Sequence, residues 1–195
     1  MSEAVQRVNA AMGTDPSGLH PDLYAASICK SFLFSVDQAH AQHPNYMGKH
    51  EKNHAPRMNA GVVVKSNSNQ RYCTNAATGF LIRELTRKAG ITPLQEFVVR
   101  NDCPCGSTIG PILSSKTGIR TVDAGMPQLS MHSCREVMGI VDRKLLQFAN
   151  FKMNCYSYPP PPSIIVVLSI PVTNCYELFL AFFKHFREVD VCLEC

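Results

Sequence analysis

One largely apolar run, residues 31–37, constrains the fold more than any other stretch of the chain. It reads Ser-Phe-Leu-Phe-Ser-Val-Asp and is followed within a few residues by His43-Pro44. An unbroken run of this kind predicts a strand buried on both faces, as in a parallel sheet. The proline then forces the chain out of regular structure. Asp37 therefore stands at the end of a buried strand, where α/β enzymes present metal or proton-transfer groups.

The rest of the chain up to residue 142 alternates between strand and helix signals. This alternation implies right-handed crossovers and a largely parallel sheet flanked by helices, which is an α/β fold. We expect strands at 61–65, 97–102 and 119–123, and helices over 1–15, 23–30, 74–89, from 92 onward, and from the loop 103–111 to Gly118.

Capping residues refine three of these expectations. Thr74 is expected to cap the helix over 74–89, whose buried stripe would consist of Phe80, Leu81, Leu85 and Ala89. Thr92, Pro93 and Gln95 together are typical of a helix start. Ser133 and Glu136 have the spacing of a capping box, which would place His132 just before a further helix.

The pattern changes after residue 142. Residues 143–174 contain four consecutive prolines, Pro159 to Pro162, and an Ile/Val-rich run without a clear period. Residues 175–195 return to helical spacing, with a stripe of phenylalanines. We therefore interpret 1–142 as one domain, 143–174 as an insertion, and 175–195 as the terminal helix of the same domain.

Composition argues against several classes of partner. The 195 residues carry a formal net charge of only +4, from scattered Lys and Arg, so we expect no nucleic-acid partner. No apolar span reaches twenty residues, so we expect no membrane partner. The nine cysteines lack regular spacing and no secretion-signal layout precedes them, which favours reduced thiols and a cytoplasmic protein.

Four motifs carry a family resemblance. The stretches are SVDQAHAQHPNYMGKHEKNHAP, VVVKSNSNQRYCTNA, VVRNDCPCGSTIGPILSSKTGIRTVDAGMPQLSMHSCRE and YELFLAFFKHFREVD. In this order they resemble the C-terminal half of aspartyl aminopeptidase, a family of cytosolic zinc exopeptidases. The resemblance covers about residues 20–142 and 175–191. It implies a partial zinc-exopeptidase catalytic domain that releases N-terminal Asp or Glu from peptides.

The resemblance also implies roles for five residues. Asp37 and His132 match metal ligands, and a carboxylate and an imidazole both suit zinc. His40 matches a histidine that contacts substrate. Lys65 and Tyr72 match residues around the substrate's acidic side chain, where an ammonium would pair with a carboxylate. The implied partners are a peptide with an acidic N-terminal residue and further copies of the chain.

The resemblance implies an incomplete site as well. The family's other ligands, a histidine, a bridging aspartate and a glutamate, and its general-base glutamate fall upstream of the matched region, so no catalytic residue is assigned. We therefore expect a truncated zinc aminopeptidase with impaired activity. Two alternatives stay open: an inactive fragment that binds full-length subunits, and a splice or gene-model product.

Weaker patterns have simpler interpretations. His43, His50 and His54 are expected to order the loop that contains them, although spacing alone would allow Asp37, His40 and His43 as a ligand trio. The glycines of 105–111 lack the Lys-Ser/Thr ending of a phosphate loop and predict a tight turn instead. The Cys-x-Cys at 103–105 and the Cys-x-x-Cys at 192–195 have no convincing metal or redox context.

Overall fold

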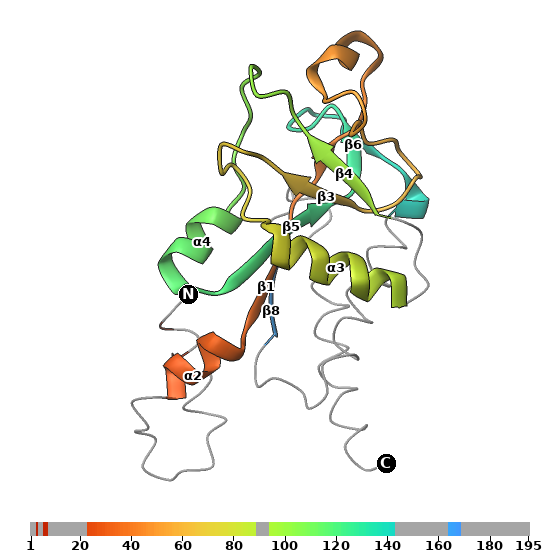
Figure 1. The fold of residues 1–195 in the computed structure, drawn as a ribbon. Coiled ribbons are helices and arrows are strands. Elements are labelled where there is room, and N and C mark those ends of the chain that lie inside the picture. The colour runs from red at the N-terminus through yellow and green to blue at the C-terminus, as the bar shows by residue number, and fades with distance from the viewer. Residues whose placement is uncertain (1–2, 4–5, 8–22, 89–93, 143–163, 169–195) are drawn as a thin grey trace.

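The structure is a computed structural model that describes residues 3, 6–7, 23–88, 94–142 and 164–168. The elements bounded within the described part include three α-helices and two sheets (Figure 1). The elements in chain order are α2 (Leu23–Lys30), β1 (Phe32–Val36), β2 (Ala39–His40), the 3-10 helix η1 (Pro44–Lys49), β3 (Val63–Ser66), α3 (Ala76–Lys88), β4 (Gln95–Val98), α4 (Gly110–Thr117), β5 (Arg120–Gly125), β6 (Pro127–Leu129), β7 (Val137–Met138) and β8 (Ile164–Leu168).

The larger sheet has five strands in the order β4-β3-β5-β1-β8. β1 pairs in parallel with both β5 and β8, and β3 pairs in parallel with β4. Only the β3–β5 pairing among these strands is antiparallel. The α/β class and the largely parallel sheet are therefore confirmed. The run over 31–37 forms β1, inside the sheet.

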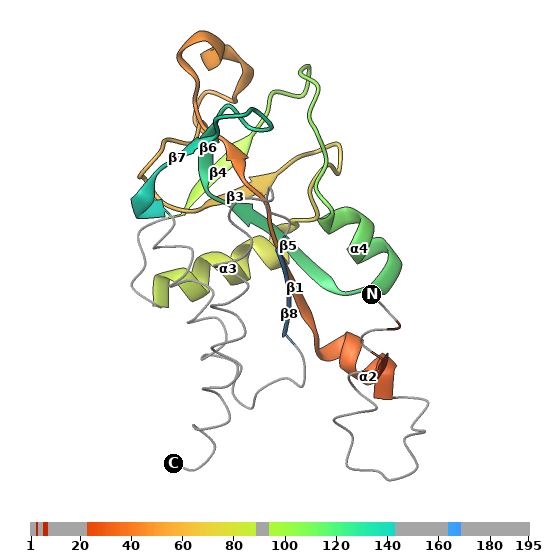
Figure 2. The ribbon, with the colours of Figure 1, turned by 180° about the vertical axis from the view of Figure 1, so that it is seen from behind.

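The two faces of this sheet are covered by different helices. On β5, Val122 and Ala124 belong to the apolar cluster that includes Ile82 of α3. The alternate residue Asp123 lies against Gly110, the first residue of α4. Because successive side chains of a strand point to opposite faces, α3 and α4 pack on opposite sides of β5. Figures 1 and 2 show this arrangement from the front and from behind.

A second, smaller sheet lies at one end of the molecule, and α2 lies at the other (Figures 1 and 2). Its strand order is β2-β6-β7, with β2 and β6 parallel and β6 and β7 antiparallel. Gly125 sits where the chain passes from β5 to β6. A Cβ atom there would lie 1.8 Å from the carbonyl oxygen of Asp37, so only glycine lets the two backbones approach so closely.

α3 differs from its expected form in its cap and its buried face. Asn75, not Thr74, caps the helix, because its Oδ1 accepts the Thr78 N–H at 2.9 Å. Phe80 is 68% exposed and Leu81 39% exposed. The predicted stripe is therefore wrong at these two positions, and Ala89 lies outside the described residues. The residues that α3 buries are Thr78, Gly79, Ile82 and Thr86.

Two expected helices are contradicted within the described residues. Gln95 begins β4 and pairs with Val63, so a helix starting at Thr92 does not continue through it. Residues 130–136 form turns and then enter β7, so no helix starts at Ser133, and the next helical residues are 140–142. The carboxylate of Glu136 does accept a backbone N–H, that of His132 at 2.6 Å, but it does so inside a tight loop.

The C-terminal division stays a prediction. β8 falls inside the range 143–174 and pairs with β1 along its whole length. The other residues of that range, and the helix expected over 175–195, lie outside the described residues. The expected helix over 1–15 also lies largely outside them.

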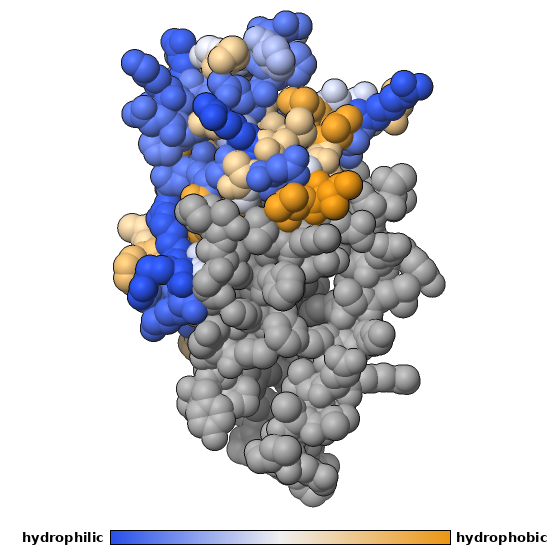
Figure 3. Space-filling model, turned by 90° about the vertical axis from the view of Figure 1, so that its right-hand side faces the viewer, coloured by the Kyte–Doolittle hydropathy of each residue, from blue (hydrophilic) through white to orange (hydrophobic). Residues whose placement is uncertain are grey.

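Apolar side chains gather on the face shown in Figure 3, with polar groups covering much of the surface above them. Among the described residues, no helix combines the length and the apolar character needed to cross a bilayer. The most exposed large apolar side chains in this part of the chain are Phe80, Ile140, Tyr46, Met47, Ile112, Val137 and Val141.

Candidate functional site

The five residues singled out from the sequence come from five separate segments. Asp37 follows β1 directly, His40 ends β2, and Lys65 lies in β3. Tyr72 lies between β3 and α3, and His132 lies in the turn after β6. The sheet brings these segments together, because β1 and β3 both flank β5, and β2 pairs with β6.

Lys65 and Asp37 form a charged pair at the centre of this group. Lys65 Nζ donates a hydrogen bond to Asp37 Oδ2 at 3.1 Å, and the lysine side chain is only 2% exposed. Burial lowers the pKa of Lys65, and the nearby charge of Asp37 partly offsets that effect. The ammonium also lies 5.2 Å from the centre of the Tyr72 ring, which is within cation–π range.

Tyr72 is held on two sides. Its hydroxyl lies 3.1 Å from the Sγ atom of Cys105, and its ring packs edge-on against Phe97 with centroids 6.0 Å apart. Burial raises the pKa of Tyr72, and the contact with Cys105 raises it further. The phenol therefore stays neutral and can donate a hydrogen bond.

His40 lies within electrostatic range of the other site residues. Burial lowers its pKa most, and the charge of Lys65 lowers it further. His50 and His132 act in the same direction, whereas Asp37 acts in the opposite one. The structure therefore brings His40, Asp37, Lys65 and His132 into one neighbourhood. At neutral pH the His40 imidazole is uncharged and can both donate and accept a hydrogen bond.

The turn that carries His132 has an unusual backbone. His132 has φ 66° and Ser130 has φ 58°, both in the left-handed region. Such conformations are uncommon outside glycine and persist where the surrounding structure holds them. Here Glu136 accepts the His132 N–H and Ser130 O accepts the Ser133 N–H at 3.0 Å. The turn thus fixes the direction in which the imidazole leaves the backbone.

Asp123 is a site residue that the sequence reasoning missed. It is fully buried in β5, and its two carboxylate oxygens accept hydrogen bonds from the Cys73 N–H at 2.6 Å and the Thr108 hydroxyl at 2.8 Å. A Cβ on Gly110 would lie 2.5 Å from this carboxylate. The loop over 105–110 therefore packs closely against the Asp123 carboxylate, which agrees with the tight turn expected there. The available signal was an acid between two apolar residues, Val122 and Ala124.

The remaining loop histidines make contacts within or beside their own loop. His43 Nδ1 accepts the Asn45 N–H at 3.1 Å, and the His50 ring stacks edge-on against Phe97. His54 lies between two carboxylates, with Nδ1 against Glu51 and Nε2 at 3.2 Å from Glu96. These contacts order the segment between β2 and β3, the role expected for these three residues.

The described residues do not complete a metal site. No group of three or more His, Cys, Asp or Glu side chains in this part of the chain is arranged to hold a metal ion. Asp37 and His132 have the donor types that zinc prefers, but catalytic zinc usually takes three protein ligands. These two residues would therefore supply part of a coordination shell.

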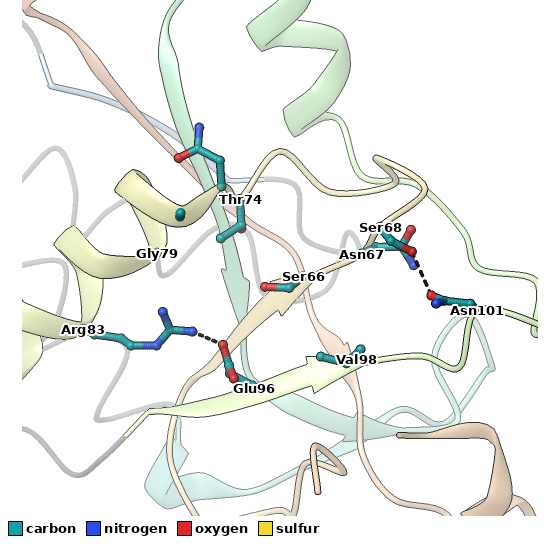
Figure 4. Close-up of a pocket in the computed structure, with 11 residues that line it drawn as sticks. Ser66, Asn67, Ser68, Thr74, Gly79, Arg83, Glu96, Val98 and Asn101 are labelled. Atoms are coloured by element: carbon teal, nitrogen blue, oxygen red, sulfur yellow. Dashed lines mark hydrogen bonds and ion pairs between the residues drawn. The ribbon is translucent and has the colours of Figure 1, made fainter. Parts of the chain in front are cut away.

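A polar hollow of about 540 Å³ lies on the opposite face of the sheet (Figure 4). Ser66 and Glu96 line it, and they alternate along their strands with the site residue Lys65 and with Phe97, which packs on Tyr72. An ion pair between Arg83 and Glu96 closes one side, as Figure 4 shows. None of the five predicted site residues lines this hollow.

Comparison with known proteins decides the family. The family model described as aminopeptidase I zinc metalloprotease (M18) matches residues 1–152. The chain belongs to the M18 aminopeptidase family. Among curated M18 relatives, the probable aspartyl aminopeptidase of Ricinus communis is 53% identical over 190 residues, which are 97% of this chain and 32% of the relative. The aspartyl aminopeptidase of Dictyostelium discoideum is 49% identical over 144 residues, 73% of this chain and 30% of the relative.

Solved structures of M18 aminopeptidases agree with this assignment. The cryo-EM structure of the Ape4 and Nbr1 complex matches with a TM-score of 0.69 at 46% identity, covering 78% of this chain and 28% of that chain. The S. cerevisiae mApe1 dodecamer matches with a TM-score of 0.62 at 29% identity, covering 99% of this chain and 35% of that chain. The chain thus spans about a third of the length of the M18 relatives it matches.

Proposed function

We propose that the chain forms the substrate-recognition wall of an aspartyl aminopeptidase active site, and that it represents the C-terminal half of such an enzyme. The observation that carries this proposal is the buried Lys65 ammonium, which pairs with Asp37 and lies over the aromatic ring of Tyr72. A buried cation beside a predicted metal ligand suits a substrate whose N-terminal residue has a carboxylate side chain.

Each residue then has a specific task. Lys65 pairs with the substrate's acidic side chain, and Tyr72 donates a hydrogen bond to it. The neutral imidazole of His40 hydrogen-bonds the substrate close to the scissile peptide. Asp37 and His132 supply two ligands to zinc, which when bound would polarise the peptide carbonyl and activate a water molecule.

The substrate is thus a peptide with N-terminal Asp or Glu, and the proposed compartment is the cytoplasm. Within the described residues, Cys29, Cys73, Cys103, Cys105 and Cys134 form no disulfide bond, which fits that compartment. Cysteines without disulfide partners are typical of proteins from a reducing environment.

The test compares anilide substrates that differ only in the N-terminal residue. With zinc present, the purified chain is expected to hydrolyse Asp- and Glu-anilides only slowly, because its site is incomplete, and not to hydrolyse Asn- or Leu-anilides. A chelator and His132→Ala should both abolish the reaction. Lys65→Met should lower kcat/KM for the acidic substrates by about 10- to 100-fold, the value of a charge-assisted hydrogen bond.

His43→Ala is the matched control, because His43 contacts only its own loop among the described residues. It should keep the acidic preference. Equal rates for Asp- and Asn-anilides in the wild-type chain would contradict the assignment of Lys65 as the recognition residue.

A second function is favoured by two observations. Only two predicted metal ligands occur in the described part of the chain, and the chain spans about a third of its relatives. We infer as the alternative a non-catalytic subunit that associates with full-length aminopeptidase. Co-elution with a full-length relative, without hydrolysis of any anilide by the chain alone, would favour this alternative.

A further inference from the structure

Asp123 connects the two segments that hold the recognition phenol. The first, the Tyr72 segment (residues 71–75), carries Tyr72, and the second, the Cys105 segment (residues 105–110), carries its hydrogen-bond partner. One carboxylate oxygen of Asp123 accepts the N–H of Cys73 at 2.6 Å, and the other accepts the hydroxyl of Thr108 at 2.8 Å. A single buried side chain therefore holds both segments.

Backbone contacts reinforce the same junction. The Asp123 N–H donates to the Thr74 hydroxyl at 3.0 Å. The Ser107 hydroxyl donates to the Arg71 carbonyl at 3.0 Å, which links the two segments directly. The position of the Tyr72 hydroxyl relative to Lys65 thus depends on contacts that converge on one residue of β5.

The sheet places this carboxylate on the same face as Lys65. Gly125 pairs with Val63 across β5 and β3. Asp123 is two residues from Gly125, and Lys65 is two residues from Val63, so all four side-chain positions lie on one face. Asp123 therefore acts from the side on which the acidic side chain of a substrate would enter, without itself being exposed.

We propose that Asp123 is a positioning residue for acidic-substrate specificity, which fixes Tyr72 against Lys65 by clamping the Tyr72 and Cys105 segments together. This inference rests on the proposed function, because it requires that Lys65 and Tyr72 recognise an acidic side chain. Asp123 touches neither substrate nor metal in this scheme. Loss of the Asp123 carboxylate should reduce the preference for acidic over uncharged substrates rather than weaken the binding of all peptides.

The test measures how well the zinc-loaded full chain distinguishes the dipeptides Asp-Ala and Asn-Ala by isothermal titration calorimetry. The wild-type chain is expected to prefer Asp-Ala. Asp123→Asn keeps the shape but removes the charge and one acceptor, and should reduce the preference about tenfold, as the loss of a hydrogen bond to a charged group would. A general loss of packing would weaken the binding of both peptides alike and leave the ratio of the two dissociation constants unchanged. Because the charge of Asp123 also acts on Lys65, the Thr108 variants described below, which keep that charge, separate positioning from electrostatics.

Asp142→Asn is the matched control. Asp142 is also fully buried and also accepts two N–H donors, from Asn59 and Gly61, but it lies at a different junction. Its variant should keep the wild-type ratio. An unchanged ratio in Asp123→Asn, with a clear preference in the wild type, would overturn this inference and leave the proposed function standing. No preference in the wild type would overturn both.

Thr108 provides a second route if Asp123→Asn does not fold. Thr108→Val removes the hydroxyl that donates a hydrogen bond to Asp123, whereas Thr108→Ser keeps it. The valine variant should lose part of the preference, and the serine variant should retain it. Equal ratios in these two variants would also overturn the inference.

Discussion

The buried pair of Lys65 and Asp37 should respond very differently to removal of each partner. The lysine side chain is 2% exposed, whereas the aspartate side chain is 27% exposed. Asp37→Asn leaves an ammonium buried without its carboxylate. Lys65→Met leaves a carboxylate that water can still reach. We therefore expect Asp37→Asn to destabilise the chain and Lys65→Met to have little effect or to stabilise it.

The geometry bounds the size of the difference. Two unit charges 3.1 Å apart interact by roughly 5 kcal/mol at the effective dielectric constant of about 20 that suits protein sites. A lysine left alone can also lose its proton, which limits the cost at pH 7 to about 5 kcal/mol. The Tyr72 ring and the charge of Asp123 remain nearby. We therefore expect a loss of about 2–4 kcal/mol for Asp37→Asn and less than about 1 kcal/mol for Lys65→Met.

The assay is urea unfolding of the full chain, followed by circular dichroism in the presence of a chelator so that bound metal does not contribute. The double variant completes a thermodynamic cycle. Because Met removes the charge that Asn leaves unpaired, the double variant should be more stable than Asp37→Asn alone. Equal destabilisation by the two single variants, or a larger loss for Lys65→Met, would refute the reasoning.

Three further predictions concern stability. Gly125→Ala should lower the free energy of unfolding in urea by more than about 3 kcal/mol, because its Cβ would lie 1.8 Å from the backbone oxygen of Asp37. Gly48→Ala, whose Cβ would have nothing within 4 Å, is the control and should be close to neutral. Similar losses in the two variants would contradict the close approach at Gly125. Asn75→Ala should lower the free energy of unfolding by about 1 kcal/mol, because the backbone N–H of Thr78, the third residue of α3, loses its capping acceptor. No change would argue against that cap. Burial lowers the pKa of His40 and of His50 below 6.5, so their contribution to the unfolding free energy is complete above that pH and is lost as pH falls through the folded-state pKa values. Unfolding measured between about pH 8 and pH 5 should show this loss, and replacing both histidines with Gln should flatten it.

Residues close together in the chain determined much of the fold by themselves. The run over 31–37 predicted β1 and the position of Asp37 at its end. The helix over 23–30 and the end of α4 before Gly118 were also predicted, and Gly118 has φ 75° as a helix-terminating glycine should. These features depend on apolar periodicity and capping, which neighbouring residues encode.

Other features depended on partners from distant segments, and only the tertiary structure decided them. α3 buries small residues and Ile82 against the sheet and leaves Phe80 exposed, because close packing on strands outweighs side-chain size. Gln95 joins a strand because Val63 offers it a backbone partner.

The same division applies to the candidate site. The motifs identified Asp37, His40, Lys65, Tyr72 and His132 as residue types suited to zinc and an acidic substrate. The sequence did not reveal Asp123, because a buried acid has meaning only when its donors are known. Cys73 and Thr108 lie 50 and 15 residues away from it along the chain. The sequence thus predicts the chemistry of the site, and the packing of the sheet decided which residues lie together there.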